Sequence, residues 1–198
     1  MKPIYTIGHS DHCLEHFIEL LAERGVGVLV DVRSSPWSRR FPHFCKAQLA
    51  SALHPAGIRH VWMGEQLGGR PSPTVREQMI GEGYAAMAAT RAFRQGLNRL
   101  LRGRATHCVA LMCAERDPAD CHRALLVGRA LAQCGAPPVH LHADGNAETH
   151  AAFERRLFEM AGANPDGDLF ASADDLLALA YVEREKRLTG VAELGEHV

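Results

Sequence analysis

The sequence has little that would mark a membrane, fibrous or disordered protein. No apolar run approaches the roughly 20 residues that a membrane-spanning helix needs. Aromatic residues make up only 6% of the 198 residues, and the chain contains no internal repeat and no low-complexity segment. Apolar residues at 46% and charged residues at 23% are ordinary globular proportions, which exclude wholesale disorder, collagen and coiled coil. We therefore expect a folded protein that does not enter a membrane.

The sequence also has almost no net charge. Lys and Arg together number 22 and Asp and Glu 23, which gives a net charge of -1. A balance this close to zero provides no global attraction to nucleic acid or to a membrane surface, although it does not exclude a local basic patch. Lysine itself is scarce, so nearly all of the positive charge is arginine.

A secretory leader is not recognisable either. Met1-Lys2-Pro3 passes directly into Ile4–Ile7, which is too short for the apolar region of a signal peptide. The chain nevertheless holds 6 Cys and 12 His, which are the unusual counts in its composition. We expect a cytoplasmic location, with the cysteine thiols reduced.

Strand-like and helix-like segments alternate along the chain. The runs at 26–32 and 106–112 are continuously apolar, which is typical of strands buried on both faces. The alternation predicts an α/β fold: a doubly wound, mainly parallel sheet of about five strands flanked by helices. The expected strands are 4–7, 26–32, 58–63, 106–112 and 139–142, and the expected helices are 11–24 with Ser10 as its cap, 46–55, 74–102 with an interruption near Gly81 and Gly83, 118–134 and 147–161; residues 64–73 are expected to form a loop.

The length favours a single domain. Residues 1–163 are expected to form the α/β domain. Residues 164–198 are expected to add a turn-rich linker, a helix to about Leu188 and a tail that packs on the domain or extends from it. Ser172-Ala-Asp-Asp175 resembles a capping box that opens this last helix.

The unusual residues follow the expected strands. In a doubly wound sheet, ligands bind beyond the carboxyl ends of the strands, so side chains that follow several strands meet at one rim. This placement predicts one composite site. Its candidate residues are His9 and Ser10 after the first strand, Arg33, Ser34 and Arg39 after the second, Arg70 after the third, and Cys113, Glu115, Cys121, His122 and Arg123 after the fourth.

Four motifs in this order resemble a known family. They are Thr6-Ile-Gly-His-Ser10, Asp31-Val-Arg-Ser34, Leu67-Gly-Gly69, and Cys113-Ala-Glu115 followed by Cys121-His-Arg123. Together they resemble bacterial domain-of-unknown-function family 488 over about residues 4–150. The resemblance implies an α/β domain with this motif set and no settled activity, so the function has to be inferred from chemistry.

The leading hypothesis is an enzyme, a hydrolase or transferase, that acts on a nucleotide, a nucleic-acid end or another phosphorylated substrate. Arginine suits bidentate phosphate recognition, and His9, Glu115 and Cys121 can supply proton transfer or a nucleophile. The hypothesis requires Arg33, His9, Glu115 and Arg123 to line one open cleft. The anion-binding and substrate-binding set is Ser10, Arg33, Ser34, Arg39, Arg70, Cys113, His122 and Arg123.

Two other function classes stay open. A non-catalytic module for nucleic acid or a partner would present a basic, aromatic surface from Trp37 to Phe44. A metal-binding protein would use thiolate, imidazole and carboxylate ligands of the segment from Cys113 to His122. The spacing there is not that of a zinc knuckle, so the sequence alone assigns no metal ligand and no cofactor. A metal would require the fold to return the start of the helix to the end of the strand.

Overall fold

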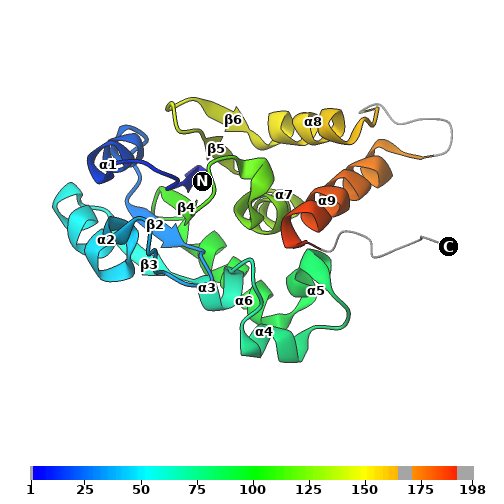
Figure 1. Ribbon diagram of the computed structural model, residues 1–198, viewed down its shortest axis with the longest axis horizontal. Helices are drawn as coiled ribbons and strands as arrows, with labels where there is room; N and C mark the ends of the chain where they lie inside the picture. Colours follow the sequence, from blue (N-terminus) through cyan, green and yellow to red (C-terminus); the bar gives the residue numbers. More distant parts are fainter. Residues whose placement is uncertain (1, 165–170, 191–198) are drawn as a thin grey trace. The chain divides into compact units, whose positions relative to one another are not determined.

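The computed structural model describes residues 2–164 and 171–190 and confirms the α/β fold. Its single sheet has the strand order β3-β2-β4-β1-β5-β6 (Figure 1). All neighbouring strands are parallel except β5 and β6, which form an antiparallel pair. The strands are β1 (Ile4–Gly8), β2 (Val28–Asp31), β3 (Arg59–Trp62), β4 (Val109–Cys113), β5 (Val139–Leu141) and β6 (Ala147–Thr149).

The chain divides into two compact units, residues 1–150 and 151–198. The first unit holds the whole sheet and the helices up to α7. The predicted boundary at residue 164 stays a prediction. The helical elements of the first unit are α1 (Leu14–Glu23), η1 (Pro42–Phe44), α2 (Lys46–Leu53), η2 (His54–Ala56), α3 (Gly64–Leu67), α4 (Pro73–Gln78), α5 (Gly83–Ala89), α6 (Arg91–Gly103), η3 (Pro118–Asp120), η4 (Arg123–Gly128) and α7 (Arg129–Gln133).

The second unit contains most of α8 (His150–Ala161) and α9 (Ala173–Thr189). The hydroxyl of Tyr181 on α9 donates a hydrogen bond of 3.1 Å to Oε1 of Glu154 on α8. The predicted capping box is confirmed, because Ser172 Oγ accepts from the Asp175 amide and the Asp175 carboxylate accepts from the Ser172 amide. The predicted linker beyond Asn164 and the tail beyond Gly190 lie outside the described residues.

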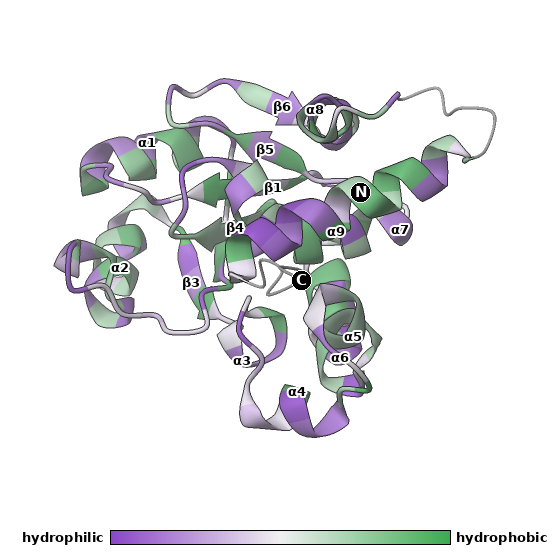
Figure 2. Cartoon of the chain, turned by 45° about the vertical axis from the view of Figure 1, so that its right-hand side comes forward, coloured by the Kyte–Doolittle hydropathy of each residue, from purple (hydrophilic) through white to green (hydrophobic). Residues whose placement is uncertain are grey.

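Helices cover both faces of the sheet, as expected for a doubly wound fold. On one face, Ile7 of β1 and Met112 of β4 pack with Phe17 and Leu21 of α1 and with Leu49 of α2. Because side chains alternate along a strand, Leu111 and Cys113 face the other side, where η4 contacts β4. Figure 2 shows the central strands as largely hydrophobic, which fits their burial on both faces.

Several local predictions were wrong. Ser10 does not cap α1, because α1 begins after Cys13 and Ser10 itself takes a left-handed turn conformation with φ 44°. The expected loop at 64–73 contains the short helix α3. The expected helix at 147–161 begins only at His150, because residues 147–149 pair with β5 across the Asp144-Gly145 turn.

β1 and β4 are neighbours in the sheet, but the helices that follow them lie on opposite faces. In parallel sheets such a pair leaves a crevice beyond the carboxyl ends of the two strands, which is the usual place for a ligand. His9 and Ser10 follow β1 there, and Glu115 follows β4. The topology therefore places His9, Ser10 and Glu115 at the switch point of the sheet.

None of the helices among the described residues is both long and apolar enough to cross a membrane.

Candidate functional site

The loop after β4 turns back toward the strand that precedes it. The fully buried side chain of Arg123 holds this loop, because Nη1 donates to the carbonyl of Glu115 at 2.6 Å and Nη2 to that of Arg116 at 3.0 Å. Gly8 lets the loop come close, since a Cβ at this position would lie 1.8 Å from the Glu115 carbonyl oxygen. The start of the following helix is thus returned to the end of β4.

The segment after the loop is not the single helix that the sequence predicts for 118–134. The turn η3 ends at Cys121, which has the extended backbone angles φ -144° and ψ 136°, and η4 follows as a π-helical turn from Arg123. Consecutive side chains on a helix point in different directions, but an extended Cys121 can share a direction with His122. Their atoms Sγ and Nδ1 lie 3.9 Å apart. Cys121 and His122 are therefore close enough to act together although they are consecutive in the sequence.

Four side chains converge at this point, and we call Cys113, Glu115, Cys121 and His122 the Cys–His–Glu cluster. One ligand-type atom from each lies within 4.8 Å of all the others. His122 Nδ1 is 3.5 Å from Cys113 Sγ, and the Cys121 thiol donates a hydrogen bond of 2.8 Å to Oε2 of Glu115. Cys113, Cys121 and His122 are buried, whereas Glu115 is exposed.

The ring of His122 is held from two sides. Its Nε2 lies 3.0 Å from the carbonyl oxygen of Val32, which can only accept, so the proton sits on Nε2 and the Nδ1 lone pair faces the two thiols. Gly69 packs against the ring, since a Cβ there would lie 2.6 Å from Cγ of His122. The Leu67-Gly-Gly69 motif therefore supports the imidazole by leaving room for its ring.

The cluster perturbs the ionisation of its own members. Burial raises the pKa of Cys121, but the hydrogen bond from Cys113 and the charges of Arg123 and His122 outweigh it, so this pKa lies well below its usual value. Burial, together with the neighbouring Cys121 and Glu115, raises the pKa of Cys113 well above its usual value. Although Glu115 is exposed as a residue, its carboxyl group is desolvated within the cluster, and this desolvation and the charge of Cys121 raise its pKa. For His122, burial lowers the pKa, but the Cys121 thiolate reverses this and the net shift is upward.

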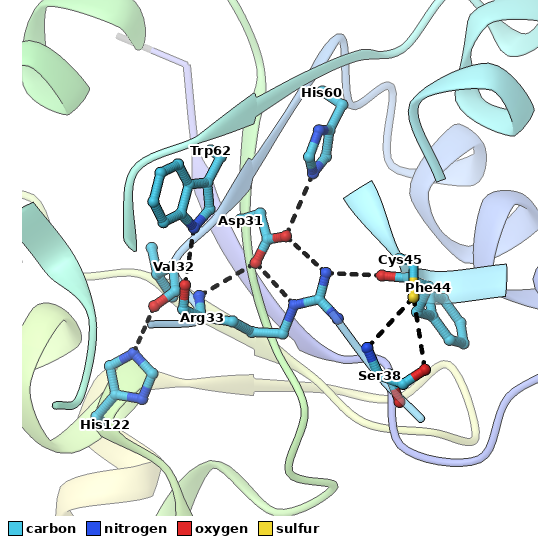
Figure 3. Close-up of polar contacts among 9 residues, drawn as sticks. All are labelled: Asp31, Val32, Arg33, Ser38, Phe44, Cys45, His60, Trp62 and His122. Carbon is cyan, nitrogen blue, oxygen red and sulfur yellow. Dashed lines mark hydrogen bonds and ion pairs between the residues drawn. The ribbon is translucent and has the colours of Figure 1, made fainter. Parts of the chain in front are cut away.

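Arg33 does not face an open cleft, because it forms a buried ion pair with Asp31 (Figure 3). Nε and Nη2 of Arg33 donate to the two carboxylate oxygens at 2.9 and 2.6 Å, and Nη2 also donates to the Phe44 carbonyl at 2.8 Å. Nε2 of His60 lies 3.3 Å from Oδ2 of Asp31. Burial raises the pKa of Asp31, but the hydrogen bonds from Arg33 and His60 lower it by a larger amount. The pKa of Asp31 therefore lies below its usual value.

His9 is buried beside this ion pair and is not placed in the Cys–His–Glu cluster. Its ring stacks on Phe44 with a centroid distance of 4.4 Å, and its Nδ1 lies 3.0 Å from the Ser10 carbonyl oxygen. Burial and the nearby charge of Arg33 lower the pKa of His9 to about 4. At neutral pH His9 is therefore an uncharged packing residue of the rim.

The remaining candidates lie apart from the cluster. Ser34 Oγ accepts from the Arg70 amide at 2.9 Å and so ties the third loop to the second. Ser10 Oγ donates to Asp11, and the side chains of Arg39 and Arg70 are exposed. Since Arg33 and Arg123 are both buried and hydrogen-bonded within the fold, Arg33, His9, Glu115 and Arg123 do not line one open cleft.

Two supporting residues were missed from the sequence, and the role of a third, Gly69 of the Leu67-Gly-Gly69 motif, was not foreseen. Trp62 Nε1 donates to the Arg33 carbonyl at 2.9 Å, His60 bonds to Asp31, and Gly69 packs on His122. A strand register could have signalled the first two, because β3 aligns Trp62 directly with Asp31. Nothing in the sequence indicates that Gly69 meets His122.

An open cleft of about 480 Å³ borders the loop that carries the cluster. Three of its lining residues, Arg116, Asp117 and Asp120, lie between Glu115 and Cys121. The others, His142, Ala143 and Asp144, follow β5. The cleft therefore lies at the same rim of the sheet.

The change Asp31→Asn is expected to lower the free energy of unfolding by about 3–5 kcal/mol, because it leaves the buried Arg33 guanidinium without its counter-charge. Urea denaturation of the wild type and the variant measures the difference. Asp11→Asn, at a fully exposed carboxyl, is the control and should leave the free energy of unfolding nearly unchanged. A loss below about 1 kcal/mol for Asp31→Asn would show that the pair is dispensable.

His9 is expected to make stability depend on pH. The folded-state pKa of about 4 lies below the unfolded value of 6.5, so the folded protein binds fewer protons. The stabilising contribution is complete above pH 6.5 and is lost as the pH falls toward 4, by up to about 3 kcal/mol. His9→Phe keeps a ring on Phe44, and its unfolding free energy should fall less over this range than that of the wild type. Parallel pH profiles would refute the assignment.

The comparisons with known proteins add the family. A model of the domain of unknown function DUF488 matches residues 13–130, which include every member of the Cys–His–Glu cluster. No curated protein and no solved structure matches the chain. Because the family model covers more than half of the chain, the chain belongs to the DUF488 family.

Proposed function

We propose that this protein is a metalloprotein whose Cys–His–Glu cluster binds one divalent transition-metal ion of the zinc type. The observation that carries the proposal is the convergence of two sulfur atoms, one imidazole nitrogen and one carboxylate oxygen within 4.8 Å of one another. These are the ligand types that zinc takes in proteins. A metal site in this segment requires the start of the helix to return to the end of the strand. The loop after β4 makes this return.

The distances suit a tetrahedral ion. Zinc bonds of about 2.3 Å to sulfur and about 2.0 Å to nitrogen, at a tetrahedral angle, place the two ligand atoms about 3.6 Å apart. His122 Nδ1 lies 3.5 Å from Cys113 Sγ and 3.9 Å from Cys121 Sγ. The short contact between Cys121 and Glu115 is a thiol hydrogen bond, whose proton a metal ion would replace.

The surroundings of His122 support the same function. Metal-bound histidines almost always donate their second ring N–H to a carbonyl or carboxylate, which fixes the tautomer and the ring orientation. Nε2 of His122 is placed to make this bond with Val32, and Gly69 packs on the ring. The imidazole is therefore presented to the two thiols as a preorganised ligand.

Glu115 is more exposed than the other three candidate ligands, and this difference favours a reactive metal centre over a purely structural one. Structural zinc sites are closed by four protein ligands, whereas catalytic sites keep a position for water or substrate. Cys113, Cys121 and His122 are buried, but Glu115 is exposed and can leave the ion or act as a base beside it. The cleft bordered by Asp117 and Asp120 offers an approach from solvent. A metal-assisted hydrolase or transferase is the enzyme class that fits.

The competing function for the same residues is a cysteine nucleophile paired with His122. The lowered pKa of Cys121 favours it. Access opposes it, because Cys121 is only 1% exposed and a nucleophile has to reach its substrate. A buried sulfur that shares a proton with the Glu115 carboxylate and lies beside the His122 imidazole is better suited to a metal ion than to attack on a substrate.

Protein purified without chelators is expected to carry about one equivalent of zinc or a similar ion. Cys113→Ser, Cys121→Ser and His122→Ala should each reduce it to below about a tenth of an equivalent, because each removes a buried ligand. Elemental analysis measures the content, and Cys134→Ser, at an exposed cysteine outside the cluster, is the matched control.

The same proteins can be titrated with cobalt(II), whose thiolate charge-transfer absorption reports sulfur ligation directly. The wild type and Cys134→Ser should develop this absorption, and the three ligand variants should not. Wild-type protein that stays metal-free after incubation with zinc and desalting, and that gives no thiolate band with cobalt, would overturn the metal site.

Glu115→Gln is expected to keep the ion, because three buried ligands remain, but to weaken its binding by about 10-fold. It should also change the visible spectrum of the cobalt-substituted protein, since the fourth ligand differs. Glu77→Gln, at an exposed acid on α4, is the control. An unchanged cobalt spectrum and affinity would show that Glu115 does not reach the ion.

A further inference from the structure

Two long segments of this nearly neutral chain contain no acidic residue, residues 32–64 and residues 83–114. The first begins after Asp31 and ends before Glu65. Of the cations between them, Arg33 is paired with Asp31, and Nη2 of Arg59 lies 3.5 Å from Nε2 of His107. The side chains of the remaining three, Arg39, Arg40 and Lys46, are exposed and have no carboxylate partner among the described ion pairs.

These three cations belong to one closed loop, residues 36–46, which we call the basic loop. The amide of Lys46 donates to the Pro36 carbonyl at 2.9 Å and closes the loop at its base. Cys45 Sγ lies 3.3 Å from the Ser38 amide that donates to it (Figure 3). Arg33 Nη2 holds the loop from beneath through the Phe44 carbonyl. The backbone is thus fixed before any partner binds, which reduces the entropy lost on binding.

The basic loop also carries an exposed aromatic residue. Trp37 is 64% exposed, and it is the only aromatic among the large hydrophobic residues that are exposed in the described part of the chain. The neighbouring aromatics are used differently: Phe44 is buried under His9, and the Arg40 guanidinium lies 5.2 Å from the centre of the Phe41 ring. The indole of Trp37 is thus exposed on the same closed loop as Arg39, Arg40 and Lys46.

We infer that the basic loop is a binding site for single-stranded nucleic acid. Sites of this kind combine positive side chains that follow the phosphates with aromatic rings on which bases stack. Arg39, Arg40 and Lys46 supply the charges, and Trp37 supplies the ring. A membrane surface is a poorer match, because the loop presents a single large exposed apolar residue and no amphipathic helix. This site is separate from the metal centre and does not depend on it.

Fluorescence anisotropy with labelled oligo(dT) and oligo(rU) of about 20 nucleotides tests the site at low and at physiological salt. The double variant R39E/R40E should bind at least about tenfold more weakly than the wild type and show a shallower salt dependence, because fewer counterions are released. The matched control is R99E/R102E, which makes the same change in charge at two exposed arginines of α6. Its affinity should stay within about twofold of the wild type.

The stacking ring has its own readout. Trp62→Phe leaves Trp37 as the only tryptophan, and its fluorescence should be quenched when the oligonucleotide binds. Trp37→Ala should weaken binding by about tenfold, while Trp37→Phe should recover part of the loss, since any aromatic face can stack. Cys121→Ser should bind like the wild type, so a failed metal site leaves this result unchanged.

Three outcomes would overturn the site. They are no saturable binding to either oligonucleotide at low salt, equal weakening by R99E/R102E and R39E/R40E, and unquenched Trp37 in a complex that does form. Binding of phosphatidylserine vesicles that R39E/R40E abolishes, with no binding of oligonucleotides, would assign the loop to a membrane surface and also reject the proposal.

Discussion

The buried guanidinium of Arg123 determines whether the chain has a site at all. Its bonds to the carbonyls of Glu115 and Arg116 bring the loop after β4 back over the end of that strand. Without this return, Cys113 at the end of the strand and Cys121 at the start of the helix would be separated by an open loop. An arginine suits this place because its planar fork can satisfy two carbonyl oxygens at once while staying charged when buried. The positive charge then also favours the Cys121 thiolate.

Val32 connects this arrangement to the second strand. Its carbonyl faces Nε2 of His122, and the next residue, Arg33, turns to the opposite face of the sheet to pair with Asp31. The two buried arginines at the rim therefore stabilise different segments. The Arg123 guanidinium holds the loop that carries the cluster. The Asp31–Arg33 pair fixes the base of the basic loop through the Phe44 carbonyl. Buried charges of this kind are tolerated because Arg33 is paired with Asp31 and Arg123 donates to two carbonyl oxygens, which offsets most of the desolvation cost. Nη1 of Arg33 and Nε of Arg123 nevertheless have no hydrogen-bond partner in the described part of the chain.

The fold and the position of the site could be predicted from the sequence, but the contacts within the site could not. The strands could be predicted because β2 and β4 are continuous apolar runs, and parallel topology then places everything after them at one rim. β6 could not be predicted, because three residues pair only through the turn at Asp144-Gly145, and their own pattern continues into α8. Propensity indicates what a segment can form, whereas a short edge strand forms only if a partner is beside it.

The site residues divide in the same way. Cys113, Glu115, Cys121 and His122 were candidates because loops do not especially favour these residue types, and they do meet. Arg33 and Arg123 were candidates for the same reason, but their side chains turn inward. No local pattern distinguishes an arginine that binds a ligand from one that binds carbonyls of its own chain, since both need the same donors. Charge balance supplies the missing information: Arg33 has Asp31 two positions before it, whereas Arg39, Arg40 and Lys46 have no acid near them in the sequence. The near-zero net charge thus arises from an uneven distribution, in which the acid-free segments 32–64 and 83–114 carry arginines and a lysine without nearby acids, and the first of them also exposes a tryptophan.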